Sequence, residues 1–268
     1  MRDLLQLYSI ESVHPNEQAI SDYIVGRLKK LNASFSVSEH GIVGWSKEYT
    51  DREDLRILLS AHMDQVQTNG APVKFYMKDD CIRGYLEDNR QTSLGADDKN
   101  GVWLILKALS DKLPFQFIIS RGEECGCVGI NALNIPYADV CLVLDRRGYH
   151  EILDRGCGGR YCSTLAQSLC NFLSDDWAVG SGSISDTDTI SSVMESVNIS
   201  TAYYKPHTAE EYTNWRQLKD LRIRICDIIG DFVHYPTSPF VYKHKLEGYK
   251  DAGLFDTGYT GIGNWKRG

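Results

Sequence analysis

The pattern of hydrophobic and polar residues alternates between helical periodicity and short uninterrupted apolar runs. Apolar residues at helical spacing predict helices over residues 16–31, 98–109, 161–173 and 214–234, the last with Asn214 as its N-cap. Apolar runs predict buried strands over residues 55–61, 115–120, 140–144 and 197–204. Because strands alternate with helices, we expect an α/β fold in three layers, with a mostly parallel central sheet covered by helices on both faces.

Residues 235–268 follow a different pattern. Pro236, Pro239 and several glycines interrupt any regular period, and aromatic residues such as Tyr249 and Trp265 are spread through the segment. We therefore expect a single domain over residues 1–234, followed by an irregular tail over residues 235–268. This tail is expected to be draped over the domain or partly disordered. Its aromatic residues favour packing on the domain or on a neighbouring subunit of a homo-oligomer.

The composition narrows the class of protein. The chain has 268 residues, of which 42% are hydrophobic, so it has ample apolar material for a core. Its net charge of −7 gives no broad basic surface for nucleic acid. We find no apolar segment of about 18 residues and no signal peptide, so neither a membrane partner nor export is expected, and the predicted location is cytoplasmic.

The eight cysteines are accordingly expected to be reduced. Cys125 and Cys127 stand one residue apart in GEECGC. Packing as small apolar side chains is the favoured interpretation of this pair, and a thiolate metal site is the alternative.

Five short segments place acids or histidines at one predicted edge of the sheet. They are SAHMDQV with His62 and Asp64, LGADDKNG with Asp97 and Asp98, SRGEECG with Glu123 and Glu124, LVLDRRG with Asp145, and YYKPHTAEE with His207. Each segment alone has an ordinary explanation, such as a helix cap or a solvated surface. Together, however, their carboxylates would repel one another without a cation, and two histidines with several carboxylates are the ligands expected for two zinc-like ions.

The order HMD, GADDKNG, GEE, LD and HTAEE resembles the co-catalytic metallopeptidase superfamily of zinc aminopeptidases and carboxypeptidases. LGADDKNG and YYKPHTAEEY are most similar to peptidase T-like members, and the resemblance covers roughly residues 62–212. It implies the phosphorylase/hydrolase-like fold of zinc exopeptidases. It also implies two divalent metal ions, zinc in the first place, with cobalt or manganese as alternatives.

The resemblance implies a role for each matching residue. His62 and Asp145 would bind one metal, and Glu124 and His207 would bind the other. Asp97 rather than Asp98 would bridge both metals. Asp64 would orient His62, and Glu123 would be the general base.

Three further features concern the substrate pocket. Arg160 in GCGGR is a candidate for binding a peptide carboxylate, with a surface turn as the more frequent alternative. Glu210 or Glu211, just after His207, and Glu123 are the candidates for binding a substrate ammonium group. Residues 185–189, SDTDT, are expected to cap a helix, and a place in the pocket wall is the second interpretation.

The implied function is hydrolysis of short peptides by a dinuclear metallopeptidase, aminopeptidase-like. The alternatives are an N-acyl amino acid deacylase or carboxypeptidase of the same superfamily, and a binding domain without catalysis. Only residues 146–206, 61 in number, separate the LD and HTAEE motifs. Peptidase T and many relatives carry a lid or dimerisation domain there, and this span is too short for one, so the resemblance leaves the substrate open.

Overall fold

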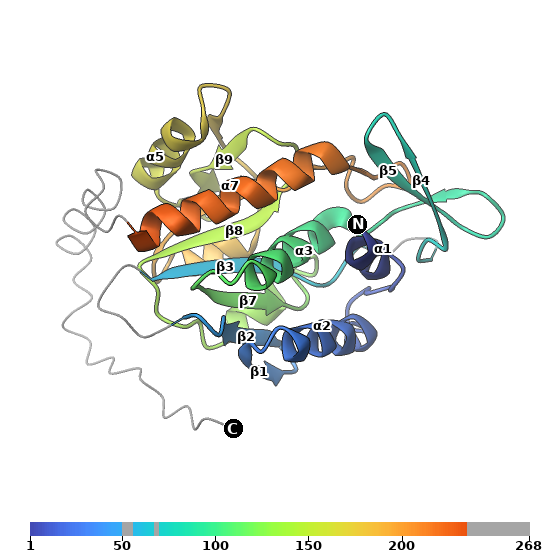
Figure 1. Ribbon diagram of the computed structural model, residues 1–268, viewed down its shortest axis with the longest axis horizontal. Helices are drawn as coiled ribbons and strands as arrows, with labels where there is room; N and C mark the ends of the chain where they lie inside the picture. The colour runs from blue at the N-terminus through green and yellow to red at the C-terminus, as the bar shows by residue number, and fades with distance from the viewer. Residues whose placement is uncertain (50–55, 67–69, 235–268) are drawn as a thin grey trace.

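The computed structural model describes residues 1–49, 56–66 and 70–234, which are coloured in Figure 1. The predicted tail over residues 235–268, with the subunit contact expected of it, lies outside the described residues.

An eight-stranded sheet forms the centre of the molecule, in the order β1-β2-β7-β3-β8-β13-β9-β12 (Figure 1). Its strands are β1 (Ser34–Ser38), β2 (Gly41–Trp45), β3 (Ile57–His62), β7 (Gln116–Ser120), β8 (Val140–Arg146), β9 (Glu151–Leu153), β12 (Ala178–Gly180) and β13 (Glu195–Ser200). The inner strands β7, β3, β8 and β13 are parallel to one another, whereas β1–β2, β2–β7 and β13–β9 are antiparallel pairs. The four predicted strands are therefore confirmed as this parallel centre, and the outer part of the sheet is mixed.

Helices cover both faces of this sheet. They are α1 (Arg2–Tyr8), α2 (Gln18–Lys30), α3 (Ala96–Ser110), α4 (Val128–Ala132), α5 (Ser163–Leu173), α6 (Asp186–Ile190) and α7 (Trp215–His234). Helices α3 and α7 lie across one face (Figure 1). Ile130 of α4 and Ile190 of α6 belong to the core cluster on the opposite face. The predicted helices correspond to α2, α3, α5 and α7, and Asn214 Oδ1 accepts a hydrogen bond from Gln217 N at 3.1 Å, which confirms the predicted cap.

The central strands are apolar on both sides because each side meets helices. Along β3, Ile57, Leu59 and Ala61 belong to the large core cluster beneath α3, whereas Leu58 belongs to the cluster on the opposite face. Successive side chains of a strand point to opposite faces. The uninterrupted apolar run in the sequence therefore reflects two separate cores.

A second sheet lies beside the first, in the order β14-β15-β5-β4, with β6 paired to β5. Its strands are β4 (Lys74–Lys78), β5 (Cys81–Tyr85), β6 (Gln91–Thr92), β14 (Tyr203–Tyr204) and β15 (Tyr212–Asn214). The pairing of β15 with β5 joins segments about 130 residues apart in the chain. This sheet holds both ends of the loop that carries His207.

Residues 146–206 contribute to the main sheet rather than to an inserted lid. Strands β9, β12 and β13 come from this span, and α5 contacts β9, β12 and β13. All eight cysteines lie within the described residues and are free thiols, as predicted. Cys127 is buried in the core, whereas Cys125 is exposed. Across the described ranges, we find no helix with the length and apolar character needed to span a bilayer.

Candidate metal centre

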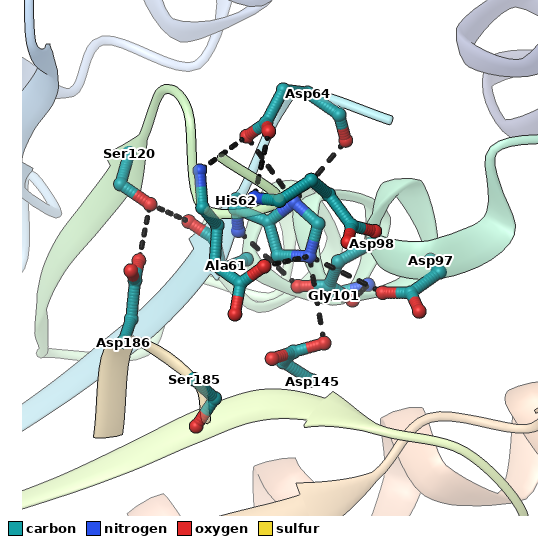
Figure 2. Close-up of polar contacts among 12 residues, drawn as sticks. Ala61, His62, Asp64, Asp97, Asp98, Gly101, Ser120, Asp145, Ser185 and Asp186 are labelled. Atoms are coloured by element: carbon teal, nitrogen blue, oxygen red, sulfur yellow. Dashed lines mark hydrogen bonds and ion pairs between the residues drawn. The ribbon is translucent and has the colours of Figure 1, made fainter. Parts of the chain in front are cut away.

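The five predicted ligand residues converge where the parallel strands end. His62 is the last residue of β3, Asp145 lies near the end of β8, and Glu124 follows the end of β7. Asp97 lies in the first turn of α3, and His207 lies in the loop between β14 and β15. Figure 2 shows His62, Asp97 and Asp145 turned toward one another. Carboxyl ends of neighbouring parallel strands meet at one sheet edge, which explains why residues so distant in sequence meet here.

The ligand atoms form two sets that share Asp97. His62 Nε2 lies 3.2 Å from Asp97 Oδ1 and 3.5 Å from Asp145 Oδ1. His207 Nε2 lies 3.3 Å from Asp97 Oδ2 and 2.8 Å from Glu124 Oε1. The two oxygens of Asp97 thus face different histidines, which is the geometry of a bridging carboxylate.

These separations fit divalent cations. Donors bound at about 2.0–2.1 Å around one tetrahedral zinc lie about 3.3 Å apart, close to most of the distances above. Ligand atoms of His62, Asp97 and Glu124 all lie within 4.8 Å of one another, as do those of His62, Asp98 and Asp145. The buried Oε1 of Glu124 receives no well-oriented hydrogen bond within the described part of the chain, although His207 Nε2 is close. An acceptor oxygen without a donor, beside an imidazole nitrogen, is suited to a cation.

Asp98 has a different role from Asp97. Asp98 Oδ2 accepts a hydrogen bond from the backbone N of His62 at 3.3 Å, and Oδ1 accepts one from Gly101 N at 3.0 Å. Both carboxylate oxygens are therefore engaged with the backbone. Asp97 and Asp98 have non-helical backbone angles and are joined by a cis peptide bond, so the regular part of α3 begins after them.

Asp64 connects His62 with the two glutamates. His62 Nδ1 lies 3.4 Å from Asp64 Oδ1 and 3.1 Å from the backbone oxygen of Asp64. The Asp64 carboxylate also accepts hydrogen bonds from the backbone N of Glu123 and of Glu124, both at 3.0 Å. Because Asp64 is fully buried, it fixes the ring of His62 and the Glu123–Glu124 backbone relative to each other.

The electrostatics of the centre favour a cation. Burial raises the pKa of Glu123 to about 10 and that of Asp145 to about 7, and neighbouring carboxylates add to both shifts. Against the effect of burial, the carboxylates of Asp145, Asp64 and Asp97 raise the pKa of His62 well above its ordinary value. This excess of buried acids is relieved when positive charge binds among them.

Glu211, one of the acids that the sequence offered for the substrate ammonium group, is buried and has a different contact. Its carboxylate accepts hydrogen bonds from Ser93 Oγ at 2.6 Å, Leu94 N at 2.8 Å and Asp97 N at 3.2 Å, and only 1% of its surface is exposed. Glu211 therefore holds the backbone that presents Asp97. A glutamate next to the exposed Glu210 gave no sequence signal for this contact.

Asp186 is the second unexpected acid. Ser185 caps α6 in a capping box with Asp188, as predicted for SDTDT, but Asp186 turns inward and accepts a hydrogen bond from Ser120 Oγ (Figure 2). Its other oxygen, Oδ1, is buried and has no hydrogen-bond partner among the described residues. Burial raises the pKa of Asp186 to about 6.

A cavity of about 980 Å³ opens onto the centre. Its wall includes Asp97, Glu123, Glu124, Asp145 and His207, together with Glu210. Glu210 is exposed and forms an ion pair with Lys205.

Arg160 is not part of this wall. It is exposed on a hairpin of β10 (Arg155–Gly156) and β11 (Gly159–Arg160), which agrees with the alternative of a surface turn.

Comparison with known proteins rests on solved structures, since no family model and no curated protein matches the chain. The fold is similar to that of the aminopeptidase PepT from Bacillus cereus ATCC 10987, with a TM-score of 0.74, 15% identity, and coverage of 87% of this chain and 97% of that one. A tripeptidase from Staphylococcus aureus subsp. aureus Mu50 gives a TM-score of 0.71 with 18% identity over 87% and 97% of the two chains. The TET1 peptidase of Pyrococcus horikoshii gives a TM-score of 0.63 with 14% identity over 85% and 98%. The chain therefore has the α/β fold of these peptidases, which confirms the predicted fold class.

Proposed function

We propose that this protein is a metal-dependent exopeptidase that removes residues from the free amino terminus of short peptides. The observation that carries the proposal is the pair of ligand sets sharing Asp97, with Glu123 in the wall of the same cavity. The similarity in fold to an aminopeptidase and a tripeptidase supports it.

The residues for two cations follow from the two sets. His62 and Asp145 would hold one ion, Glu124 and His207 the other, and Asp97 both. Zinc is the first candidate, with cobalt and manganese as alternatives, because imidazole and carboxylate ligands suit all three. Bound there, two such ions would polarise the scissile carbonyl and lower the pKa of the attacking water.

Glu123 is proposed as the proton carrier. Its Oε2 lies 4.0 Å from His62 Nε2, beside the ligands but outside the closer contacts of both sets. The ionised form of Glu123 would be favoured by cations bound among the acids. The carboxylate would then take a proton from the attacking water and deliver it to the leaving amine. Asp64, which accepts the hydrogen bond from Glu123 N, keeps this carboxylate in position during both transfers.

The amino terminus of the substrate requires negative charge in the cavity. Glu123 and Glu210 both line the wall, whereas Glu211 is turned away into its contacts with Ser93 and Leu94. We therefore assign Glu210 to the ammonium group. The ammonium would set the first peptide bond beside Glu123.

The test compares trialanine with N-acetyl-trialanine as substrates of the zinc-loaded protein. Acetylation removes the charge and two of the donors of the amino group, so trialanine should be cleaved and the acetylated peptide spared. Release of acetate from the acetylated peptide would instead support a deacylase, and faster release of alanine from it would support a carboxypeptidase. Absence of cleavage in every peptide, with two metals bound, would support a binding domain.

Self-association remains a prediction, since the residues expected to mediate it lie outside the described ones. The TET1 peptidase of Pyrococcus horikoshii can assemble into a tetrahedron or a large octahedral shell, which supports a homo-oligomer for this fold. Light scattering on the purified chain would measure its mass. A monomer at working concentration would contradict the prediction.

A further inference from the structure

Two adjoining cavities share a wall made of cationic residues. The cavity over the candidate metal centre has a neighbour of about 410 Å³. Three residues line both cavities: Arg146, Arg147 and Lys205. All three carry positive charge, although the first cavity is otherwise dominated by acids.

The backbone holds these cations close to two of the predicted ligands. Arg146 and Arg147 directly follow Asp145, and Lys205 precedes His207 by two residues. The backbone carbonyl oxygen of Arg146 accepts a hydrogen bond from Thr201 N at 2.7 Å, and that of Arg147 accepts one from Ser200 Oγ at 3.2 Å. The cationic wall is therefore fixed to the same strand ends as the acids.

Charge within the wall is only partly neutralised. Arg146 pairs with Glu151 at 2.8 Å, and Lys205 pairs with Glu210. Arg147 forms no ion pair with any residue in the described part of the chain, and its side chain is exposed. One positive charge is thus available to a ligand that enters between the two cavities.

Aromatic rings form the far wall of the smaller cavity. Tyr204 and Tyr212 stack with ring centroids 5.0 Å apart and planes 10° apart. The guanidinium of Arg83 lies 5.0 Å from the centroid of Tyr212, and Tyr204 donates a hydrogen bond to Gln217 Oε1 at 2.6 Å. Glu151 also lines this cavity, and its charge is neutralised by Arg146. With an aromatic side and, on its rim, an Arg147 that has no ion pair among the described residues, the cavity fits a small ligand that carries a carboxylate.

We propose that Arg147, with Arg146 and Lys205, binds a carboxylate of the peptide substrate in this second cavity. The inference rests on the proposed function and adds the direction in which the peptide lies in the two cavities. The ammonium end lies among the acids, and a carboxylate lies against the cations. That carboxylate is either the C-terminus of a short peptide or an acidic side chain, and the two sources are separable by experiment.

The experiment measures equilibrium binding by calorimetry to the zinc-loaded Glu123→Gln protein, so that no peptide is consumed. The probes are trialanine, its C-terminal amide, and amidated tripeptides that begin with Glu or with Gln. If the C-terminus is the ligand, trialanine binds about 10- to 100-fold more tightly than its amide, the usual effect of a charge-assisted contact. If an acidic side chain is the ligand, the amidated peptide beginning with Glu exceeds the one beginning with Gln by a similar factor.

Either preference should shrink in Arg147→Gln and nearly vanish in the double variant Arg147→Gln, Lys205→Gln. Arg216→Gln is the matched control, because Arg216 is exposed on α7 and lines neither cavity. Equal binding of all four peptides, or a preference that survives in Arg147→Gln, would overturn the inference. The proposed function is judged separately, by whether the wild-type protein cleaves trialanine.

Discussion

Replacing Asp186 by Asn should stabilise the metal-free protein at neutral pH. Asp186 is 1% exposed, and one of its oxygens has no hydrogen-bond partner among the described residues. Burial raises its pKa from the ordinary 3.8 to about 6. The hydrogen bond from Ser120 and the charge of His62 oppose this shift, and the charge of Asp64 adds to it. A buried carboxylate that is ionised at neutral pH therefore opposes folding.

The direction and size of this change in the free energy of unfolding follow from proton linkage. Between about pH 4 and pH 6 the native state holds this proton more tightly than the unfolded chain, so the free energy of unfolding falls as the pH rises. Above about pH 6 the loss is complete and amounts to about 3 kcal/mol, at about 1.4 kcal/mol per pH unit. Asn does not titrate, and its amide oxygen can still accept the hydrogen bond from Ser120. Asp186→Asn should therefore exceed the wild type in stability by up to about 3 kcal/mol at pH 7, and by little near pH 4.

Urea unfolding of both EDTA-treated proteins, followed by circular dichroism between about pH 4.5 and pH 7.5, measures this difference. Asp176→Asn is the matched control, since Asp176 is exposed and the substitution makes the same chemical change at the surface. A stability difference between Asp186→Asn and the wild type that stays constant across the range would refute the titration of Asp186. A variant that is less stable at every pH would show that the ionised carboxylate is favourable.

Three further predictions concern the metal centre. Glu211→Gln places an amide group against donors that now meet a carboxylate. The free energy of unfolding in urea should therefore fall by about 2–4 kcal/mol, and zinc should bind more weakly because Asp97 is less well held. Glu39→Gln, at an exposed position, should change neither quantity. Glu123→Gln should keep both metals and slow turnover by about 10²–10⁴-fold, whereas Glu124→Gln should lose metal in elemental analysis, and equal metal loss in the two variants would contradict their separate roles. Chelation of the metals should lower the melting temperature, and added zinc should restore it. At a hundredfold excess of zinc over Kd, one bound ion adds about 3 kcal/mol to the free energy of unfolding. A melting temperature that does not change with zinc would argue against a cation site.

The sequence predicted the parallel centre of the fold better than its margins. Strands β3, β7, β8 and β13 are buried on both faces, so their apolar runs are unmistakable. Strand β4, by contrast, carries Lys74 and Lys78 at its ends and is half exposed, and its turn into β5 uses Asp79 and Asp80 at positive φ. Such a strand is stabilised by its pairing with β5 and shows little hydrophobic pattern of its own.

The candidate site was predictable where chemistry follows directly from a strand end. His62 and Asp145 are such cases, because their position at the sheet edge follows from the strands that precede them. Glu211 and Asp186 were not predictable, since their partners Asp97 and Ser120 are 114 and 66 residues away in the chain. Only the three-dimensional fold shows that Glu211 holds the backbone of Asp97 and that Asp186 is buried beside Ser120.

His207 gives the second sheet a share in the metal centre. The other four predicted ligands are carried by the main sheet and α3, whereas the loop of His207 is held at its ends by β14 and β15. A cation coordinated by both groups would act as a crosslink between two layers that fold from separate stretches of chain. Metal occupancy would then slow amide hydrogen exchange in β14, β15 and β5 more than in β1 and β2, and a substitution in the remote β4–β5 hairpin would alter metal affinity without touching a ligand.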